Sequence, residues 1–97
     1  MSALSYFVEF IGTFFFLSVI IATGQPLLIA LSLLAVILLG GAVSGGHFNP
    51  AVSVMMWMKG ALSPQDMGAY IVAQLLGGAG AYYAYTYFLQ GLRTNVF

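Results

Sequence analysis

The segment SGGHFNPAVS, residues 44–53, holds a dense set of hydrogen-bonding groups and helix signals. Its two successive glycines allow unusual backbone angles and a close approach to other groups. Asn49 is a favoured helix N-cap, and Pro50 is a favoured first helical residue. If the side-chain oxygen of Asn49 caps the helix, its NH2 group remains free to donate a hydrogen bond to a solute. The pattern therefore predicts free backbone carbonyls, from Gly45 to Phe48, that lead to a donor at a helix start.

The chemistry of this segment suits a path for small neutral molecules. Carbonyl acceptors followed by an amide donor can exchange hydrogen bonds with a passing molecule, and the partial positive charge of the helix start opposes cations and protons. The alternative interpretation is that Asn49 caps a helix and does nothing more. The flanking segments are strongly apolar, and non-helical backbone at membrane depth is tolerated only where it is buried in protein or lines a watery cavity. This constraint favours the interpretation as a solute path over the interpretation of Asn49 as a helix cap alone.

Two titratable residues each allow a functional and a structural interpretation. Glu9 is either a proton site or a carboxylate that accepts hydrogen bonds from backbone N–H groups of segment 44–53, and the lack of a second acid nearby favours the acceptor. His47 is either a relay or ligand, or a hydrogen-bonded structural residue. Metals need three or four ligands, and the chain has one histidine and no cysteine. We therefore predict no catalytic residues, no metal, no cofactor and no enzyme activity.

The composition is that of an integral membrane protein. The 97 residues are 62% hydrophobic and 4% charged, with a mean hydropathy of +1.04, whereas soluble domains carry about 25% charged residues. The charged side chains are Glu9, Lys59, Asp66 and Arg93. They form no basic patch, which excludes nucleic acid as a partner and leaves the lipid bilayer as the surrounding medium.

Three apolar segments must hold the central segment in place. They run from about residue 4 to 23, 27 to 43 and 66 to 90, and each is long enough to cross a hydrocarbon core of about 30 Å. The first has no Lys/Arg start and is longer than a signal-peptide core, so we expect it to stay in the membrane. The helix that starts at Pro50 has room for only about 15 Å before Lys59.

A helix this short and this apolar predicts a re-entrant segment over residues 44–59, which enters the membrane and returns to the same face. We therefore expect residues 1–97 to form a single all-α membrane domain, with three transmembrane helices and one re-entrant half-helix.

Three motifs resemble the aquaporin and aquaglyceroporin family, the major intrinsic proteins. SGGHFNPAVS is similar to the family's first NPA loop, VEFIGTFFFL at residues 8–17 to its first-helix signature, and AYIVAQLLGG at residues 69–78 to its third helix. The resemblance implies half of the aquaporin fold and a passive channel for water or small neutral solutes such as glycerol and ammonia.

The resemblance also assigns site residues. Ile29 matches a selectivity-filter position, Val52 stands where second halves of the family carry an arginine, and Glu9 and Gln74 support the loop. The expected pore-lining residues are Ile29, Gly45, Gly46, His47, Phe48, Asn49, Pro50, Ala51 and Val52.

Family members carry two such halves in inverted orientation, whereas this chain has one NPA triplet. We expect the pore to be completed by antiparallel pairing of two copies; a separate second-half protein and a non-conducting role in helix association are the alternatives. The family's grouping of four pores implies eight chains. Self-pairing requires dual topology, and Lys59 and Arg93 on opposite faces give almost no orientation bias.

Overall fold

The computed structural model describes residues 2–89, which are helical apart from short connections. Helix α1, Ala3–Thr23, begins at Ser2, whose hydroxyl accepts from the Ser5 N–H, and ends at Gly24 in the left-handed conformation. Helix α2, Pro26–Ser44, starts with proline and ends at Gly45, also left-handed. Both helices are long and apolar enough to cross a membrane. They cover the first two predicted spans.

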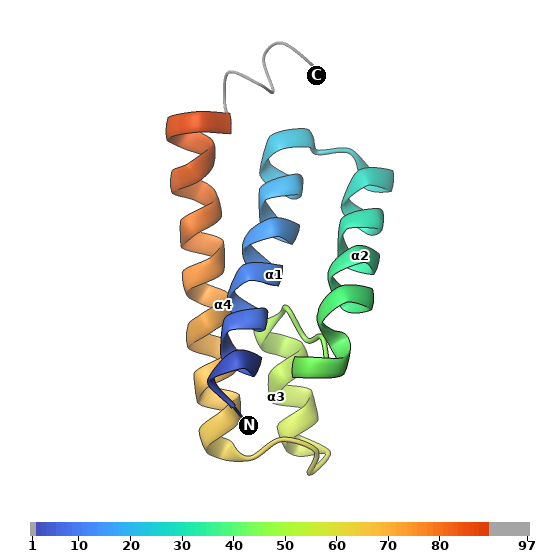
Figure 1. The fold of residues 1–97 in the computed structure, drawn as a ribbon, viewed down its shortest axis with the longest axis vertical. Coiled ribbons are helices and arrows are strands. Elements are labelled where there is room, and N and C mark those ends of the chain that lie inside the picture. The colour runs from blue at the N-terminus through green and yellow to red at the C-terminus, as the bar shows by residue number, and fades with distance from the viewer. Residues whose placement is uncertain (1, 90–97) are drawn as a thin grey trace.

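Helix α3, Pro50–Met58, is capped by Asn49 and has nine residues, so it is about 14 Å long. Residues 45–49 rise from the end of α2 to the middle of the bundle, and α3 runs back towards the end at which α2 finished (Figure 1). Residues 45–58 therefore enter and leave the bundle at the same end.

Helix α4, Pro64–Ala84, begins where Ser63 accepts from the Asp66 N–H. Its start therefore lies two positions before Asp66, where the apolar span was predicted to begin. A π-helical turn follows at Tyr85–Leu89, and no pattern in the sequence predicts it. The predicted end at Gln90 and the cation Arg93 lie outside the described residues.

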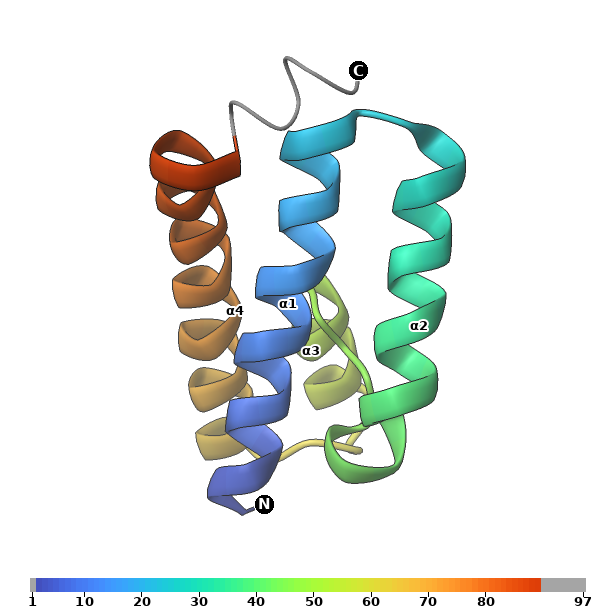
Figure 2. The ribbon, with the colours of Figure 1, turned by 45° about the horizontal axis from the view of Figure 1, so that its top comes forward.

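Helix α1 is the centre of the arrangement. It packs against α4 on one side and α2 on the other, while α3 packs against α4. Within residues 2–89, the backbones of α2 and α4 do not pack against each other, and Figure 2 shows α1 between them. The first residues of α1 and the last turns of α4 lie at opposite ends of the molecule (Figure 1).

The fold buries polar side chains and exposes apolar ones. Glu9, Ser53 and Gln74 are at most 1% exposed, while many leucines, isoleucines and phenylalanines of the helices face outward. Water would disfavour such a surface, because apolar area is stabilised by removal from water. A bilayer accepts it, since lipid tails are as apolar as leucine and polar groups must find partners inside the protein.

Candidate functional site

Asn49 is the N-cap of α3, and Figure 1 shows that α3 begins in the middle of the bundle. Its Oδ1 accepts from the Ala51 N–H at 2.8 Å, and the residue is exposed. The loop reaches this point through a left-handed backbone, with φ of +90° at Gly45, +69° at Gly46 and +52° at Phe48. Glycine adopts such angles without strain, whereas a phenylalanine needs surrounding contacts that hold it there.

Glu9 supplies those contacts. Its Oε2 accepts from Ser44 Oγ at 2.7 Å and from the His47 N–H at 3.1 Å. Its Oε1 accepts from the Phe48 N–H at 2.8 Å and from Gln74 Nε2 at 2.9 Å. Four donors therefore surround a carboxylate that is fully buried. Hydrogen bonds of this kind stabilise a buried charge without a counter-ion, so Glu9 ties the loop to α1.

A second set of hydrogen bonds fixes α3. His47 Nδ1 lies 2.9 Å from Ser53 Oγ, and Gln74 Nε2 donates to the same hydroxyl at 2.9 Å. Tyr70 donates to the Ser44 carbonyl at 2.6 Å and packs edge-on against the His47 ring. These contacts place the histidine in a structural network, and within the described residues no group of three or more His, Cys, Asp and Glu side chains could hold a metal ion.

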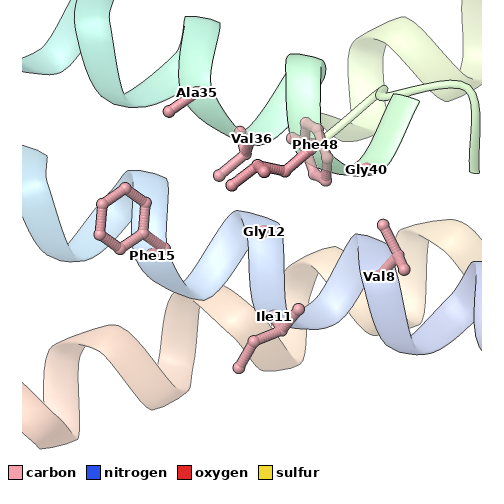
Figure 3. Close-up of a pocket in the computed structure, with 9 residues that line it drawn as sticks. Val8, Ile11, Gly12, Phe15, Ala35, Val36, Gly40 and Phe48 are labelled. Atoms are coloured by element: carbon pink, nitrogen blue, oxygen red, sulfur yellow. The ribbon is translucent and has the colours of Figure 1, made fainter. Parts of the chain in front are cut away.

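The Phe48 ring fills the space between α1 and α2 (Figure 3). It is 2% exposed, and a Cβ added to Gly12 would lie 2.2 Å from its Cε1 atom. Gly40 approaches it from α2. The ring lies against an apolar groove of about 350 Å³ between the two helices. The side chain of Phe48 thus anchors the loop, so only the backbone of this residue can contribute to the predicted solute path.

A second groove of about 460 Å³ lies at the tip of α3, and we call it the tip groove. Its residues come from α1, the loop, the start of α3 and the middle of α4: Thr13, Phe16, Leu17, Phe48, Asn49, Pro50, Gln74, Leu75, Gly78 and Ala79. The groove brings the capping asparagine beside two buried polar residues of the long helices.

The remaining predicted pore residues lie outside the tip groove. Gly45 and Ala51 are exposed, Gly46 and Val52 are half-buried, and His47 is buried. Ile29 lies in the first turn of α2, half-buried, where its carbonyl accepts from Ser32.

Sequence reasoning did not single out Ser44, Ser53 or Tyr70. Ser53 had a local signal, because it lies one helical turn after the Asn49 cap. The bond from Tyr70 to the Ser44 carbonyl had no local signal, since it joins residues 26 positions apart.

The buried carboxylate of Glu9, the loop of residues 45–49 and the capping Asn49 form one connected region. Residues 23–96 match the sequence profile described as major intrinsic protein. The chain belongs to the major intrinsic protein family. It is therefore an integral membrane protein, as the composition predicted, and the resemblance drawn from the three motifs is confirmed.

Several curated relatives have bacterial sources. The chain is 36% identical over 96 residues to glycerol uptake facilitator protein-like 6 of Lactiplantibacillus plantarum, covering 90% of the chain and 44% of the relative. It is 40% identical over 55 residues to Aquaporin Z of Photorhabdus laumondii, covering 57% and 24%. It is 42% identical over 57 residues to aquaglyceroporin AqpS of Rhizobium meliloti, covering 59% and 22%.

The chain spans less than half the length of these major intrinsic protein relatives. No solved structure matches it.

Proposed function

We propose that this chain is one half of a passive membrane channel for water or small neutral solutes such as glycerol and ammonia. The observation that carries the proposal is the capped start of α3 in the middle of the bundle, where Asn49 Oδ1 accepts from the Ala51 N–H and the Asn49 NH2 group has no hydrogen-bond partner within residues 2–89. In this proposal α1, α2 and α4 cross the bilayer, and residues 44–59 form the re-entrant half-helix.

The hydrogen-bonding groups at the tip suit a neutral solute. The Asn49 amide donates, and the backbone carbonyls of residues 45–48 accept, so a molecule with both functions exchanges its water contacts for protein contacts. The start of α3 carries a partial positive charge, which disfavours a proton or metal cation at the same point. The carboxylate of Glu9 does little to cancel this positive charge, because its two oxygens already accept hydrogen bonds from four donors.

A pore of this kind needs a second half, which we assign to a second copy of the chain. The tip groove is lined by α1, the loop, the start of α3 and α4 of one chain, and the chain covers 44% of its glycerol facilitator relative. Since α3 runs from the middle of the bundle towards one end (Figure 1), two copies bring their α3 tips together end to end only in antiparallel orientation. In the pair, Ile29 and Val52 supply the apolar constrictions, with no arginine.

Liposome permeability tests the proposal. Purified chain is reconstituted alone, and vesicle volume under water and glycerol gradients is followed by stopped-flow light scattering beside lipid-only vesicles. We expect flow above the lipid control in the wild type. We expect Asn49→Ala to lower it roughly fivefold or more, since a buried polar partner is worth about 1–3 kcal/mol.

Asn49→Ser is the matched control, because serine caps helices almost as well as asparagine but lacks the NH2 group. Reduced flow in this variant, with helix content unchanged by circular dichroism, supports a role in conduction. Solute flow at the wild-type level in Asn49→Ser would mean that Asn49 acts only as a helix cap. Folded wild type that conducts no better than lipid would refute self-pairing, and co-reconstitution with a second-half relative would then separate a heteromeric channel from a non-conducting protein.

A further inference from the structure

The hydroxyl of Ser53 lies between two side chains that belong to different parts of the fold. Ser53 is in α3, one helical turn after Asn49, and is 0% exposed. Its Oγ atom is 2.9 Å from Gln74 Nε2 of α4 and 2.9 Å from His47 Nδ1 of the loop. A hydroxyl group has one proton to donate and two lone pairs that accept. The direction of these two hydrogen bonds therefore decides which nitrogen of the histidine ring carries a proton.

The direction of the first bond is set by Glu9. A carboxylate only accepts, so Gln74 must turn its NH2 group towards Glu9 Oε1, which lies 2.9 Å away. The same nitrogen carries a second proton, which it donates to Ser53 Oγ. Ser53 thus accepts from Gln74, and the proton of its own hydroxyl group remains for a different partner.

The partner for that proton is His47 Nδ1, the other side-chain atom with which the structure pairs Ser53 Oγ within residues 2–89. If Nδ1 carried a proton, it would donate as well, and the Ser53 proton would have no acceptor. Fully buried polar groups are seldom left unpaired in this way. An imidazolium ring fails for the same reason, because both of its nitrogens donate. The hydrogen bonds therefore require a neutral ring with its proton on Nε2.

The Nε2 atom lies at the surface of the chain, beside Gly45. The ring is 8% exposed, and the fully buried unpaired side-chain atoms within residues 2–89 belong instead to Thr13, Ser18 and Gln74. A Cβ placed on Gly45 would lie 3.4 Å from Nε2. Gly45 is exposed and begins the predicted carbonyl segment of residues 45–48. A proton on Nε2 thus provides a donor next to the first of these carbonyls.

We propose that Ser53 is a positioning residue for the solute path: it donates to His47 Nδ1 and thereby keeps the proton of the neutral ring on Nε2, beside Gly45. The Asn49 NH2 group is the donor at the other end of the carbonyl segment. A solute consequently meets a donor at each end of a row of acceptors, whereas the opposite tautomer would present a lone pair at the Gly45 end. The inference rests on the proposed function for the solute path.

The tautomer can be read directly, because the chain has one histidine. Protein labelled with nitrogen-15 and carbon-13 histidine is reconstituted in liposomes and studied by solid-state NMR at about pH 8, above the usual histidine pKa of about 6.5. Protonated and unprotonated ring nitrogens have well separated chemical shifts. We expect a protonated Nε2 and an unprotonated Nδ1 in the wild type. A ring that carries its proton on Nδ1 would overturn the proposal.

Substitutions of Ser53 test its role in setting the tautomer. Ser53→Ala removes the donor to Nδ1, so we expect the population with a proton on Nδ1 to rise roughly fivefold or more. Ser53→Thr keeps a hydroxyl group and should restore the wild-type spectrum. Ser32→Ala is the matched control, since Ser32 is also a buried helical serine, but its hydroxyl donates to the Ile29 carbonyl. An unchanged spectrum in folded Ser53→Ala would overturn the role of Ser53, and the wild-type spectrum keeps the tautomer testable if this variant does not fold.

Transfer of magnetisation from water tests where the ring donor points. The backbone N–H of His47 is the internal control, because it is buried and donates to Glu9 Oε2 at 3.1 Å. In the labelled wild type, we expect the water signal to reach the Nε2 proton sooner than this backbone proton. Transfer to the Nε2 proton that is no faster would overturn its position on the solute path.

Spectra and permeability together separate this inference from the proposed function. We expect solute flow in liposomes to fall in Ser53→Ala and to persist in Ser53→Thr. Unchanged flow in Ser53→Ala, with an altered tautomer, would overturn the part that the ring donor plays in the path. The expected tautomer in a chain that conducts no better than lipid would support the role of Ser53 in setting it and refute the channel. Flow through a wild type with its proton on Nδ1 would overturn the inference and leave the channel standing.

Discussion

Replacement of Gly77 by alanine should disturb the contact between α1 and α4 on which the site depends. A Cβ at this position would lie 2.8 Å from the Phe10 carbonyl oxygen and 3.0 Å from the Phe14 nitrogen. Both are backbone atoms of α1, so neither can turn aside as a side chain would. Since ordinary contact begins at 3.4 Å, α4 must retreat by roughly 0.6 Å, and overpacking of this kind costs about 1–3 kcal/mol.

The matched control is Gly68→Ala, also in α4, where an added Cβ meets nothing within 4 Å. Both variants gain the same helix propensity, about 1 kcal/mol. Their difference in the free energy of unfolding therefore isolates the clash, and we expect Gly77→Ala to be less stable by about 1–3 kcal/mol. Titration with a denaturing detergent in mixed micelles, followed by circular dichroism, measures it.

The displacement of α4 in Gly77→Ala should also weaken the hydrogen bonds around Glu9. Gln74 lies one turn before Gly77, so the 2.9 Å bond from its Nε2 to Glu9 would lengthen towards the value of about 3.6 Å at which it no longer counts as a hydrogen bond. We expect solute flow in liposomes to fall in Gly77→Ala and to persist in Gly68→Ala. Equal stability of the two variants, within about 0.5 kcal/mol, would refute the close helix approach and the reasoning built on it.

Three further substitutions probe the loop and the helix start. Glu9→Gln replaces a carboxylate that accepts from four donors, and each donor left unpaired should cost about 1–3 kcal/mol in the same detergent titration. Gly12→Ala should push the Phe48 ring out of place, at about 1–3 kcal/mol. Phe48→Leu in the same chain should return part of that loss, and additive effects would contradict the contact. Ser63→Ala removes the cap on the Asp66 N–H and should cost about 1 kcal/mol, with solute flow unchanged.

The helix starts could be predicted because their signals are local. Asn49-Pro50 and Ser63-Pro64 each combine a capping side chain with a proline whose missing N–H costs nothing at that position, and the structure shows both caps. The short length of α3 followed from the same reasoning. In each case, the interacting groups lie within a few residues of one another.

From residue types alone, the polar network could be predicted at Glu9, and the family resemblance added Gln74. A carboxylate in an apolar helix must have partners, so Glu9 was conspicuous, whereas Ser44, Ser53 and Tyr70 are common residue types in membrane helices. Their roles depend on the packing of α1, the loop and α4, which no local pattern encodes. The left-handed backbone at Phe48 could not be predicted either. Glycine favours this conformation, so Gly45 and Gly46 indicate it by their residue type, whereas Phe48 adopts it because Glu9 and Gly12 hold the residue in place.

The order in which Glu9 gains its partners has a consequence for biosynthesis. Chains are made from the N-terminus, and their early parts can fold before the later ones exist. Three of the four donors, from Ser44, His47 and Phe48, precede α3 in the chain, and only Gln74 belongs to α4. A nascent chain that has been made as far as Met58 thus already contains Glu9 and three of its four donors, which together hold the loop against α1. Arrival of α4 then closes the network.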